Sequence, residues 1–292
     1  MQLLRVGPAG AERPAGRTED GRLVDLSSVT ADFDRGFFAD GGVARAAEAV
    51  ESGSLAQLDP EGPRIGPPIA RPGKIVCIGL NYRDHAAEID TEPPAEPVVF
   101  MKAANTVVGP YDEVLIPLGS RKTDLEVELA VVIGRTARYL ESPKAAEDVI
   151  AGYAISNDVS EREFQLERGG QWDKGKSCET FNPFGPVLLT ADEVPDPQNL
   201  GLRLWVNGQL RQDGNTKNMI FPVHYVLWYL SQFMVLEPGD VVNTGTPAGV
   251  AMGLPGQPYL KPGDVLELEI DGLGRQRQTV GKARAEQLCP TR

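Results

Sequence analysis

Glycine and proline interrupt this chain from one end to the other, and this limits the folds that it can adopt. The 292 residues include 32 glycines and 24 prolines, which exceeds the usual combined share of about 12%. Both residues favour turns, and proline also breaks helices. Because they are spread along the chain and do not cluster, we predict many short strands joined by turns.

Short runs of β-branched and other apolar residues recur from Lys74 onward. In the run LRLWVNGQLRQ, alternating residues flank Asn207-Gly208, which predicts a hairpin with a type I′ turn. Helical patterns are fewer, and the clearest cover residues 81–89 and 221–234. The sequence therefore predicts an α+β, β-rich fold, a roll or sandwich that a few helices cover. The other strand-like runs are KIVCIG, PVVFM, LEVELAVVIG, AGYAISND, DVVNTG and VLELEI.

Residues 1–70 are predicted to form a small N-terminal α/β domain. The runs LLRV and GRLVDLSS resemble the strands of a short hairpin, and GVARAAEAVES has a helical pattern. A linker rich in proline and glycine follows, from Leu58 to Gly73, and it indicates a domain boundary. We therefore expect a second, larger domain at residues 71–292.

Charge and cysteine content exclude several classes of protein. The chain has 29 basic and 41 acidic residues, a net charge of −12, so a basic surface for nucleic acid is not expected. The cysteines, Cys77, Cys178 and Cys289, are far apart and fit a reducing compartment. We see neither a signal peptide nor an apolar run near the ~18 residues that span a membrane. We therefore expect a cytoplasmic protein without nucleic-acid or membrane partners.

The run TDLEVELAVVIG places several acids on one side of a predicted strand. Side chains alternate between the two faces of a strand, so Asp124, Glu126 and Glu128 share one face, opposite the apolar residues. Two carboxylates about 4 Å apart repel by ~4 kcal/mol at an effective dielectric near 20. Either water screens them or a cation lies between them. Taken alone, such residues are more often a solvated strand face.

A third acid, Asp158, ends the predicted strand AGYAISND. Together with Glu126 and Glu128 it would form an all-oxygen site, which suits Mg²⁺, Mn²⁺ or Ca²⁺. Three carboxylates and one divalent cation leave a charge of −1, so an anionic substrate would need cations nearby. The candidates are Lys102, Lys176 and Arg162, the last of which is expected one helical turn after Asp158, although each alone is more often a surface charge.

The segment NYRDHAAE carries a possible general base. His85 and Glu88 lie three residues apart and therefore share one face of a helix. A carboxylate beside a histidine orients the imidazole and raises its basicity, which prepares it to take a proton from water. An isolated pair of this kind is more often a surface contact. The other histidine, His224, lies in the predicted helix 221–234 and is interpreted as structural.

The segment from Gly170 to Ser177 matches the pattern of a phosphate-binding P-loop, G-x-x-x-x-G-K-S. A P-loop follows an apolar strand and opens a helix. Here no apolar strand precedes it, and Pro183, Gly185 and Pro186 follow too closely for a long helix. Nucleotide binding is therefore not expected.

Six segments, in this order, resemble the fumarylacetoacetate hydrolase family. They span nearly all of residues 74–280. The resemblance implies a β-rich roll, which is a mixed β-sandwich like the C-terminal domain of that family, preceded by a small N-terminal domain. Further segments are most similar to the branch that hydrolyses acylpyruvates or 2,4-diketo-3-deoxy sugar acids, whose members are often labelled ureidoglycolate lyase. The six segments are GLNYRDHAAE, FMKAANTVVGP, DLEVELAVVIG, ISNDVSERE, KGKSCETFNPFGP and PGDVVNTGTPAGV.

The resemblance implies a role for each candidate residue. It implies that a divalent metal, Mg²⁺ or Mn²⁺, is bound and that a 2,4-dioxo acid is cleaved at a carbon–carbon bond to pyruvate and a carboxylic acid. Oxaloacetate decarboxylation, tautomerisation of an enol-keto acid and non-catalytic ligand binding are the alternatives. The implied roles are metal binding for Glu126, Glu128 and Asp158, catalysis for His85, Glu88 and Lys176, and substrate binding for Lys102, Arg162, Gln165 and Thr246.

Some positions depart from the branch. Ser177 and Glu179 stand where Gly and Asp are usual in the sugar-acid enzymes, and Phe184 lies in a run that is bulkier than its counterpart. We expect Phe184 to reshape the pocket. Relatives are commonly homodimers, and Trp228 and Phe233 are candidates for exposed apolar residues at such an interface.

Overall fold

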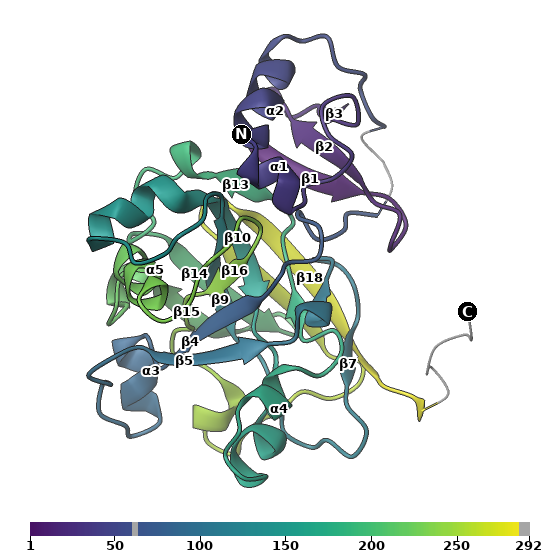
Figure 1. The fold of residues 1–292 in the computed structure, drawn as a ribbon. Helices are drawn as coiled ribbons and strands as arrows, with labels where there is room; N and C mark the ends of the chain where they lie inside the picture. The colour runs from purple at the N-terminus through teal and green to yellow at the C-terminus, as the bar shows by residue number, and fades with distance from the viewer. Residues whose placement is uncertain (60–63, 286–292) are drawn as a thin grey trace.

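Two β-sheets form the body of the protein (Figure 1). The structure is a computed structural model and describes residues 1–59 and 64–285; part of the predicted linker and Cys289 lie outside these ranges. In the described residues, a nine-stranded sheet has the order β3 (Leu23–Asp25), β2 (Arg13–Arg17), β1 (Gln2–Val6), β13 (Leu188–Thr190), β10 (Ile150–Asn157), β9 (Val127–Ile133), β16 (Val241–Asn243), β4 (Ile75–Gly79), β5 (Val98–Lys102). A five-stranded sheet has the order β15 (Gln209–Asn215), β14 (Gly201–Val206), β17 (Val265–Ile270), β18 (Gly274–Lys282), β7 (Val114–Ile116).

Short elements complete the fold. Two further strand pairs are β8 (Thr123–Asp124) with β11 (Ser160–Glu161), and β6 (Val107–Val108) with β12 (Asn182–Pro183). The α-helices are α1 (Arg35–Ala39), α2 (Gly42–Glu51), α3 (Arg83–Glu88), α4 (Asp173–Lys176) and α5 (Val223–Ser231). A π-helix, η3, covers Glu163–Glu167. The 3₁₀ helices are η1 (Ala104–Thr106), η2 (Pro143–Val149), η4 (Ala191–Glu193), η5 (Thr216–Asn218) and η6 (Ala251–Gly253).

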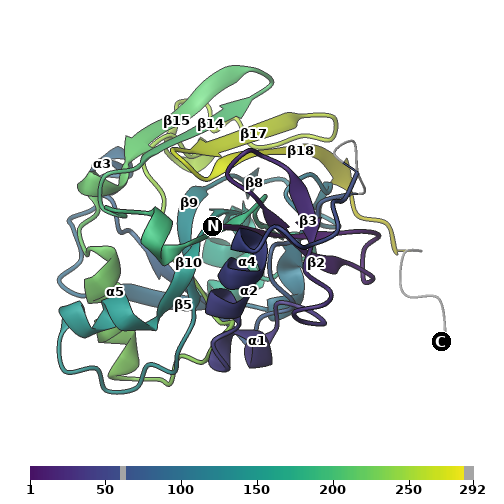
Figure 2. The ribbon, with the colours of Figure 1, turned by 90° about the horizontal axis from the view of Figure 1, so that it is seen from above.

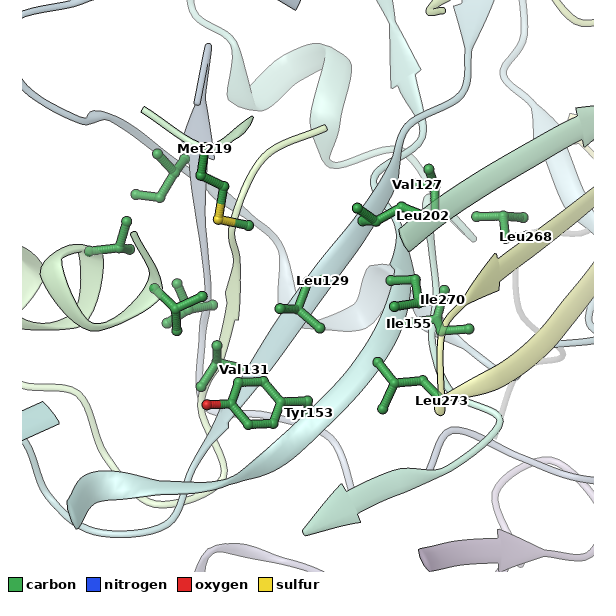
Figure 3. Close-up of a cluster of buried hydrophobic side chains, with 14 of the residues drawn as sticks. Val127, Leu129, Val131, Tyr153, Ile155, Leu202, Met219, Leu268, Ile270 and Leu273 are labelled. Carbon is green, nitrogen blue, oxygen red and sulfur yellow. The ribbon is translucent and has the colours of Figure 1, made fainter. Parts of the chain in front are cut away.

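The main core lies between the two sheets, which form separate layers in Figure 2. Side chains from β9 and β10, such as Leu129 and Ile155, pack there against Leu202 and Ile270 of the smaller sheet (Figure 3). The alternate residues of β9, Ala130 and Val132, belong to a second core on the other face. The large sheet is therefore buried on both faces at β9, which confirms the predicted β-rich, layered fold.

The N-terminal residues extend the large sheet. Strand β1 pairs with β13 on one side and with β2 on the other, and β2 pairs with β3. The predicted hairpin of LLRV with GRLVDLSS was therefore wrong, because an intervening strand separates them. That strand, RPAGR, contains both Pro14 and Gly16, which strands disfavour, so its sequence did not indicate a strand. The division into domains at residue 70 stays a prediction.

Other predicted elements are confirmed with changed ends. Helices α2, α3 and α5 lie within the predicted segments, and α5 is shorter because Pro222 is its N-cap residue. Asn207 and Gly208 both have positive φ angles, 51° and 75°, as the type I′ turn between β14 and β15 requires. Of the two proposed interface residues, Phe233 is 66% exposed, but Trp228 is half-buried; the homodimer stays a prediction. Across residues 1–59 and 64–285, every helix is too short or too polar to cross a membrane.

Candidate functional site

The predicted strand TDLEVELAVVIG is interrupted where its acids begin. Residues 125–126 separate β8 from β9. Residues 158–159 separate their paired strands, β11 and β10. At this double break, the backbone N–H of Asp158 donates to the carbonyl oxygen of Glu126 at 2.9 Å, and the side chain of Asn157 accepts from the N–H of Glu126. The break therefore holds Glu126 and Asp158 next to each other. Arg162 follows the short strand β11, so the predicted helical turn between Asp158 and Arg162 was wrong.

Glu126, Glu128 and Asp158 form a compact carboxylate cluster. One carboxylate oxygen from each residue lies within 4.8 Å of the others. The exposed fractions are only 5%, 2% and 0%, so these side chains are not a solvated strand face. The strand pattern taken alone favoured solvation because like charges repel, whereas here cations from distant segments lie beside the acids.

Two lysines and one arginine neutralise most of the cluster. Lys176 Nζ lies 2.7 Å from Glu126 Oε2 and 2.8 Å from Asp158 Oδ2. Arg162 Nη2 lies 2.7 Å from the other oxygen of Glu126, and Lys102 pairs with Asp158. Among the described residues, no cationic side chain forms an ion pair with Glu128. Its hydrogen bond comes from the backbone N–H of Gly245, at 2.8 Å.

This asymmetry shifts the ionisation of the cluster. Burial raises the pKa of Glu128 well above its ordinary value, and the carboxylates of Asp158 and Glu126 raise it further. Burial would also raise the pKa of Glu126, but Lys176 and Arg162 favour its ionised form and hold its pKa at about 2. For Lys176, burial opposes the charged form, yet Asp158 and Glu126 raise the pKa of its ammonium group. Lys176 lowers the pKa of Glu128 only in part, and among the described residues Glu128 is the carboxylate of the cluster without an ion pair.

The predicted catalytic pair lies on helix α3. His85 Nδ1 is 3.1 Å from Glu88 Oε2, and His85 is only 6% exposed. The other oxygen of Glu88 accepts from the N–H of Gly249 at 2.8 Å. An ionised carboxylate can only accept hydrogen bonds, so this contact favours the tautomer of the neutral imidazole with its proton on Nδ1 and its lone pair on Nε2. The other histidine, His224, lies on α5, and its Nδ1 is 3.8 Å from a carboxylate oxygen of Glu147.

A cavity of about 240 Å³ joins these groups. Its lining includes His85, Glu126, Glu128, Arg162, Gln165, Lys176 and Thr246, together with apolar side chains. The cavity therefore brings together all but three of the predicted site residues. Glu88 lies behind His85, and Asp158 and Lys102 lie behind the cavity wall.

The predicted substrate-binding residues differ in how free their polar atoms are. Arg162 donates to Gln165 Oε1 at 3.0 Å as well as to Glu126. The hydroxyl of Thr246 donates to the carbonyl of Val127 and accepts from Gln212. The side chain of Lys102 is fully enclosed and donates to Asp158 and to the carbonyl of Val159, so its contact with a substrate stays a prediction.

Other expectations lie outside the cavity. Phe184 is fully buried in the second core and does not line the cavity, so the expectation that it reshapes the pocket was wrong. Ser177 accepts from the N–H of Ala103 at 3.0 Å, and Glu179 is exposed. The rejected P-loop segment contains a single helical turn, α4, and its lysine, Lys176, points into the carboxylate cluster.

Sequence reasoning missed residues that hold the site in place. Asp124 is fully buried and accepts from Arg162 Nε at 2.9 Å and from the N–H groups of Ala251 and Met252. Its position in the D-x-E-x-E alternation was a usable signal. Gly253 packs on Glu88: a Cβ atom at this glycine would lie 2.5 Å from the carboxyl carbon. No pattern in the sequence indicated that contact.

Comparisons with known proteins identify the family of this chain. Residues 74–281 match the family model described as fumarylacetoacetate (FAA) hydrolase C-terminal. A protein of Burkholderia multivorans (strain ATCC 17616 / 249), named "Putative hydrolase", is 51% identical over 285 residues, which are 97% of this chain and 100% of that protein.

Solved structures with the same fold include two named hydrolases. Fumarylacetoacetate hydrolase from psychrophilic Exiguobacterium antarcticum is 35% identical, with a TM-score of 0.85 over 97% of this chain and 100% of that chain. Maleylpyruvate hydrolase from Sphingobium sp. SYK-6, solved with manganese(II) and pyruvate, is 29% identical, with a TM-score of 0.79 over the same shares. With its catalytic-domain match, its shared fold and its buried acidic cluster, this chain belongs to the fumarylacetoacetate hydrolase family.

Proposed function

We propose that this protein is a divalent-metal-dependent hydrolase that cleaves a 2,4-dioxo acid at the C3–C4 bond, giving pyruvate and a carboxylic acid. The observation that carries the proposal is one cavity lined both by Glu126 and Glu128 of the three-carboxylate cluster and by His85, whose ring contacts Glu88. The maleylpyruvate hydrolase structure with manganese(II) and pyruvate supports it, because that relative has the same fold.

The donor set fits a hard divalent cation. All three side chains offer carboxylate oxygens, which suit Mg²⁺ and Mn²⁺ better than softer metals. Glu128 is buried without an ion-pair partner among the described residues, so a cation there would stabilise its ionised form. When bound, the metal would be held by Glu126, Glu128 and Asp158 and would supply Lewis-acid polarisation of the substrate's 2-keto group.

The charged end of the cavity suits an α-keto carboxylate. Arg162 and Lys176 present a guanidinium and an ammonium group at the cavity wall, and both are buried. Charged donors in a buried site bind a carboxylate more strongly than they would in water. We infer that they orient the carboxylate and the 2-keto oxygen, while Gln165 steadies Arg162.

His85 is placed to move the protons. Glu88 holds Nδ1–H, so Nε2 takes a proton from a water molecule, and the water oxygen bonds to C4 of the substrate. The C3–C4 bond then breaks and its electron pair passes to C3, forming the enolate of pyruvate, whose oxygen Lys176 stabilises. The proton on His85 returns to C3. The products are pyruvate and the acid that carries the former C4.

The test is a turnover assay with Mn²⁺ on acetylpyruvate and, in parallel, on oxaloacetate. The matched blank is Glu128→Gln, which removes a metal-binding oxygen without stripping a partner from any of the buried cations. We expect metal-dependent formation of pyruvate and acetate from acetylpyruvate, and none from the blank.

Other outcomes would contradict the proposal in distinct ways. Pyruvate and CO₂ from oxaloacetate, without cleavage of acetylpyruvate, would identify a decarboxylase. Interconversion of the enol and keto forms without cleavage would identify a tautomerase. Binding of Mn²⁺ with no turnover of either compound would indicate a non-catalytic binding protein.

A further inference from the structure

The lining of the cavity contains charged and apolar side chains, which are called here the charged end and the apolar wall. Both of its lining cations, Arg162 and Lys176, are bound to Glu126 at the charged end. The apolar wall consists of side chains from segments far apart in sequence: Leu80, Ile89, Phe100, Leu166, Trp172 and Met252.

The apolar wall is closely packed around its aromatic residues. The rings of Phe100 and Trp172 lie 5.3 Å apart. Trp172 also packs on Gly79, where a Cβ atom would lie only 2.6 Å from the indole ring. Lys176 Nζ lies 4.9 Å from the centre of the Phe100 ring, so this ring marks the boundary between the charged end and the apolar wall.

The wall offers little to a polar substrate group. Among the described residues that line the cavity, the arginine and the lysine are both paired with Glu126, and the exposed residue Thr91 supplies a hydroxyl. A carboxylate placed against the wall would lose its hydration without gaining an ion pair. Sugar hydroxyls would lose hydrogen bonds to water, whereas methylene groups would gain from leaving water.

We propose that the preferred substrate is a 2,4-dioxo acid whose C4 acyl group is an uncharged, apolar chain, with Leu166 and Trp172 as specificity-determining residues. This inference rests on the proposed function and selects among its substrates. The cavity volume, about 240 Å³, is below the ~300–1,000 Å³ of pockets for drug-sized ligands. The acyl chain is therefore short.

The first experiment compares kcat/KM values with Mn²⁺ for acetylpyruvate, butyrylpyruvate, maleylpyruvate and a 2,4-diketo-3-deoxy sugar acid. One methylene in an apolar pocket changes kcat/KM by roughly 10–200-fold, so we expect butyrylpyruvate to exceed acetylpyruvate at least tenfold. Both should exceed the dicarboxylate and the sugar acid. A higher kcat/KM for maleylpyruvate or the sugar acid would overturn the inference and leave the proposed function standing. Cleavage of none of the four would overturn both.

The second experiment tests the wall itself with Leu166→Lys. Leu166 lies on the π-helix η3 and is 43% exposed, so the substitution does not disturb a packed core. A new ammonium group at the wall should raise the ratio of kcat/KM for maleylpyruvate to that for butyrylpyruvate by about tenfold or more. The matched control is Leu210→Lys, at a leucine that is 51% exposed on β15, outside the cavity. An equal ratio in the two variants would overturn the inference.

Discussion

Glu126 and Glu128 of the carboxylate cluster and His85 of the His85–Glu88 pair line one cavity, but different kinds of contact hold the cluster and the pair in place. The cluster projects from the ends of β9 and β10, and Lys176 bridges Glu126 and Asp158 directly. The pair lies on α3, a helix of six residues at the periphery of the sheet (Figure 1). Isolated helices of this length are not stable in water, so α3 depends on its attachments.

Those attachments lie mainly at one end of the helix. Just before α3, Asn81 bonds to the backbone of Phe221 and Thr244, and Tyr82 is fully buried in the main core. At the other end, Glu88 itself provides the contact, through the N–H of Gly249. Glu88 thus also secures its own helix. The comparison teaches that sheet register fixes the carboxylate cluster, whereas the position of the His85–Glu88 pair depends on the contacts of its own helix.

The largest effect is expected from Glu128→Gln in the carboxylate cluster, which should lower turnover without lowering the stability of the metal-free protein. Glu128→Gln removes a ligand oxygen, so turnover should fall by more than the roughly 10–100-fold that follows from changing an outer-shell residue. The metal-free protein should not lose stability, because the neutral amide relieves repulsion from Asp158 and Glu126. Turnover assays and urea unfolding without metal check both parts. A large loss of metal-free stability would show that Glu128 has a cationic partner.

Glu126→Ala is the contrasting variant at the same end. It leaves Lys176 and Arg162 with one fewer buried counter-charge, and breaking a buried ion pair in this way costs about 3–5 kcal/mol. The free energy of unfolding, measured without metal, should therefore fall by about this amount. Equal stability of Glu126→Ala and Glu128→Gln would contradict the assignment of partners.

At the helical end, His85→Ala should lower kcat by about 10²–10⁴-fold, the usual contribution of a general base. Metal binding should be largely unchanged, because among the described residues no hydrogen bond or ion pair joins α3 to the three carboxylates. The matched control is His224→Ala, which changes the other histidine of the chain and should retain wild-type kcat. Wild-type turnover in His85→Ala would sink the assignment of the base.

A smaller effect is expected from displacing the Glu88 side chain while His85 and Glu88 themselves are kept. Gly253→Val would place a side chain against Glu88 and displace the carboxylate, and a misplacement of about 1 Å can cost roughly 10²-fold in rate. Pro255→Val, at an exposed position of the same loop, is the control. Kinetics at saturating Mn²⁺ should show the loss in kcat for Gly253→Val alone. If both variants lost activity equally, the contact with Glu88 would not matter.

The smallest effect concerns pH and the metal-free protein. The pKa of Glu128 in the folded state is raised above its ordinary value near 4.5, so the folded state binds more protons than the unfolded state. The stabilising effect of this proton is lost as the pH rises from about 4.5 through the raised pKa. Glu128→Gln should therefore flatten this part of a plot of Tm against pH. An unchanged slope would contradict the raised pKa.

Much of the fold and part of the arrangement of the site could be predicted from the sequence. Alternation alone placed Glu126 and Glu128 on one face of a strand, opposite Val127 and Leu129, and the cavity lining and core confirm this arrangement. The i,i+3 spacing predicted the contact between His85 and Glu88. These features depend on neighbours within one strand or one helical turn, which a sequence displays directly.

The remaining features depend on contacts between distant segments. The break at residues 125–126 exists because β8 and β9 pair with different strands, and the burial of the acids depends on lysines from β5 and α4. The anchoring of Glu88 by Gly249 spans 161 positions. Periodicity carries no information on such contacts, and the apolar wall, built from many segments, could not be predicted for the same reason.

The central claim is that one cavity has a metal-binding end and an independent proton-transfer end. A calorimetric titration with Mn²⁺ of the wild type, Glu128→Gln and His85→Ala tests it most directly. The account predicts that His85→Ala binds Mn²⁺ as the wild type does and that Glu128→Gln loses most of this affinity. Retained affinity in Glu128→Gln, or an equal loss in His85→Ala, would contradict it.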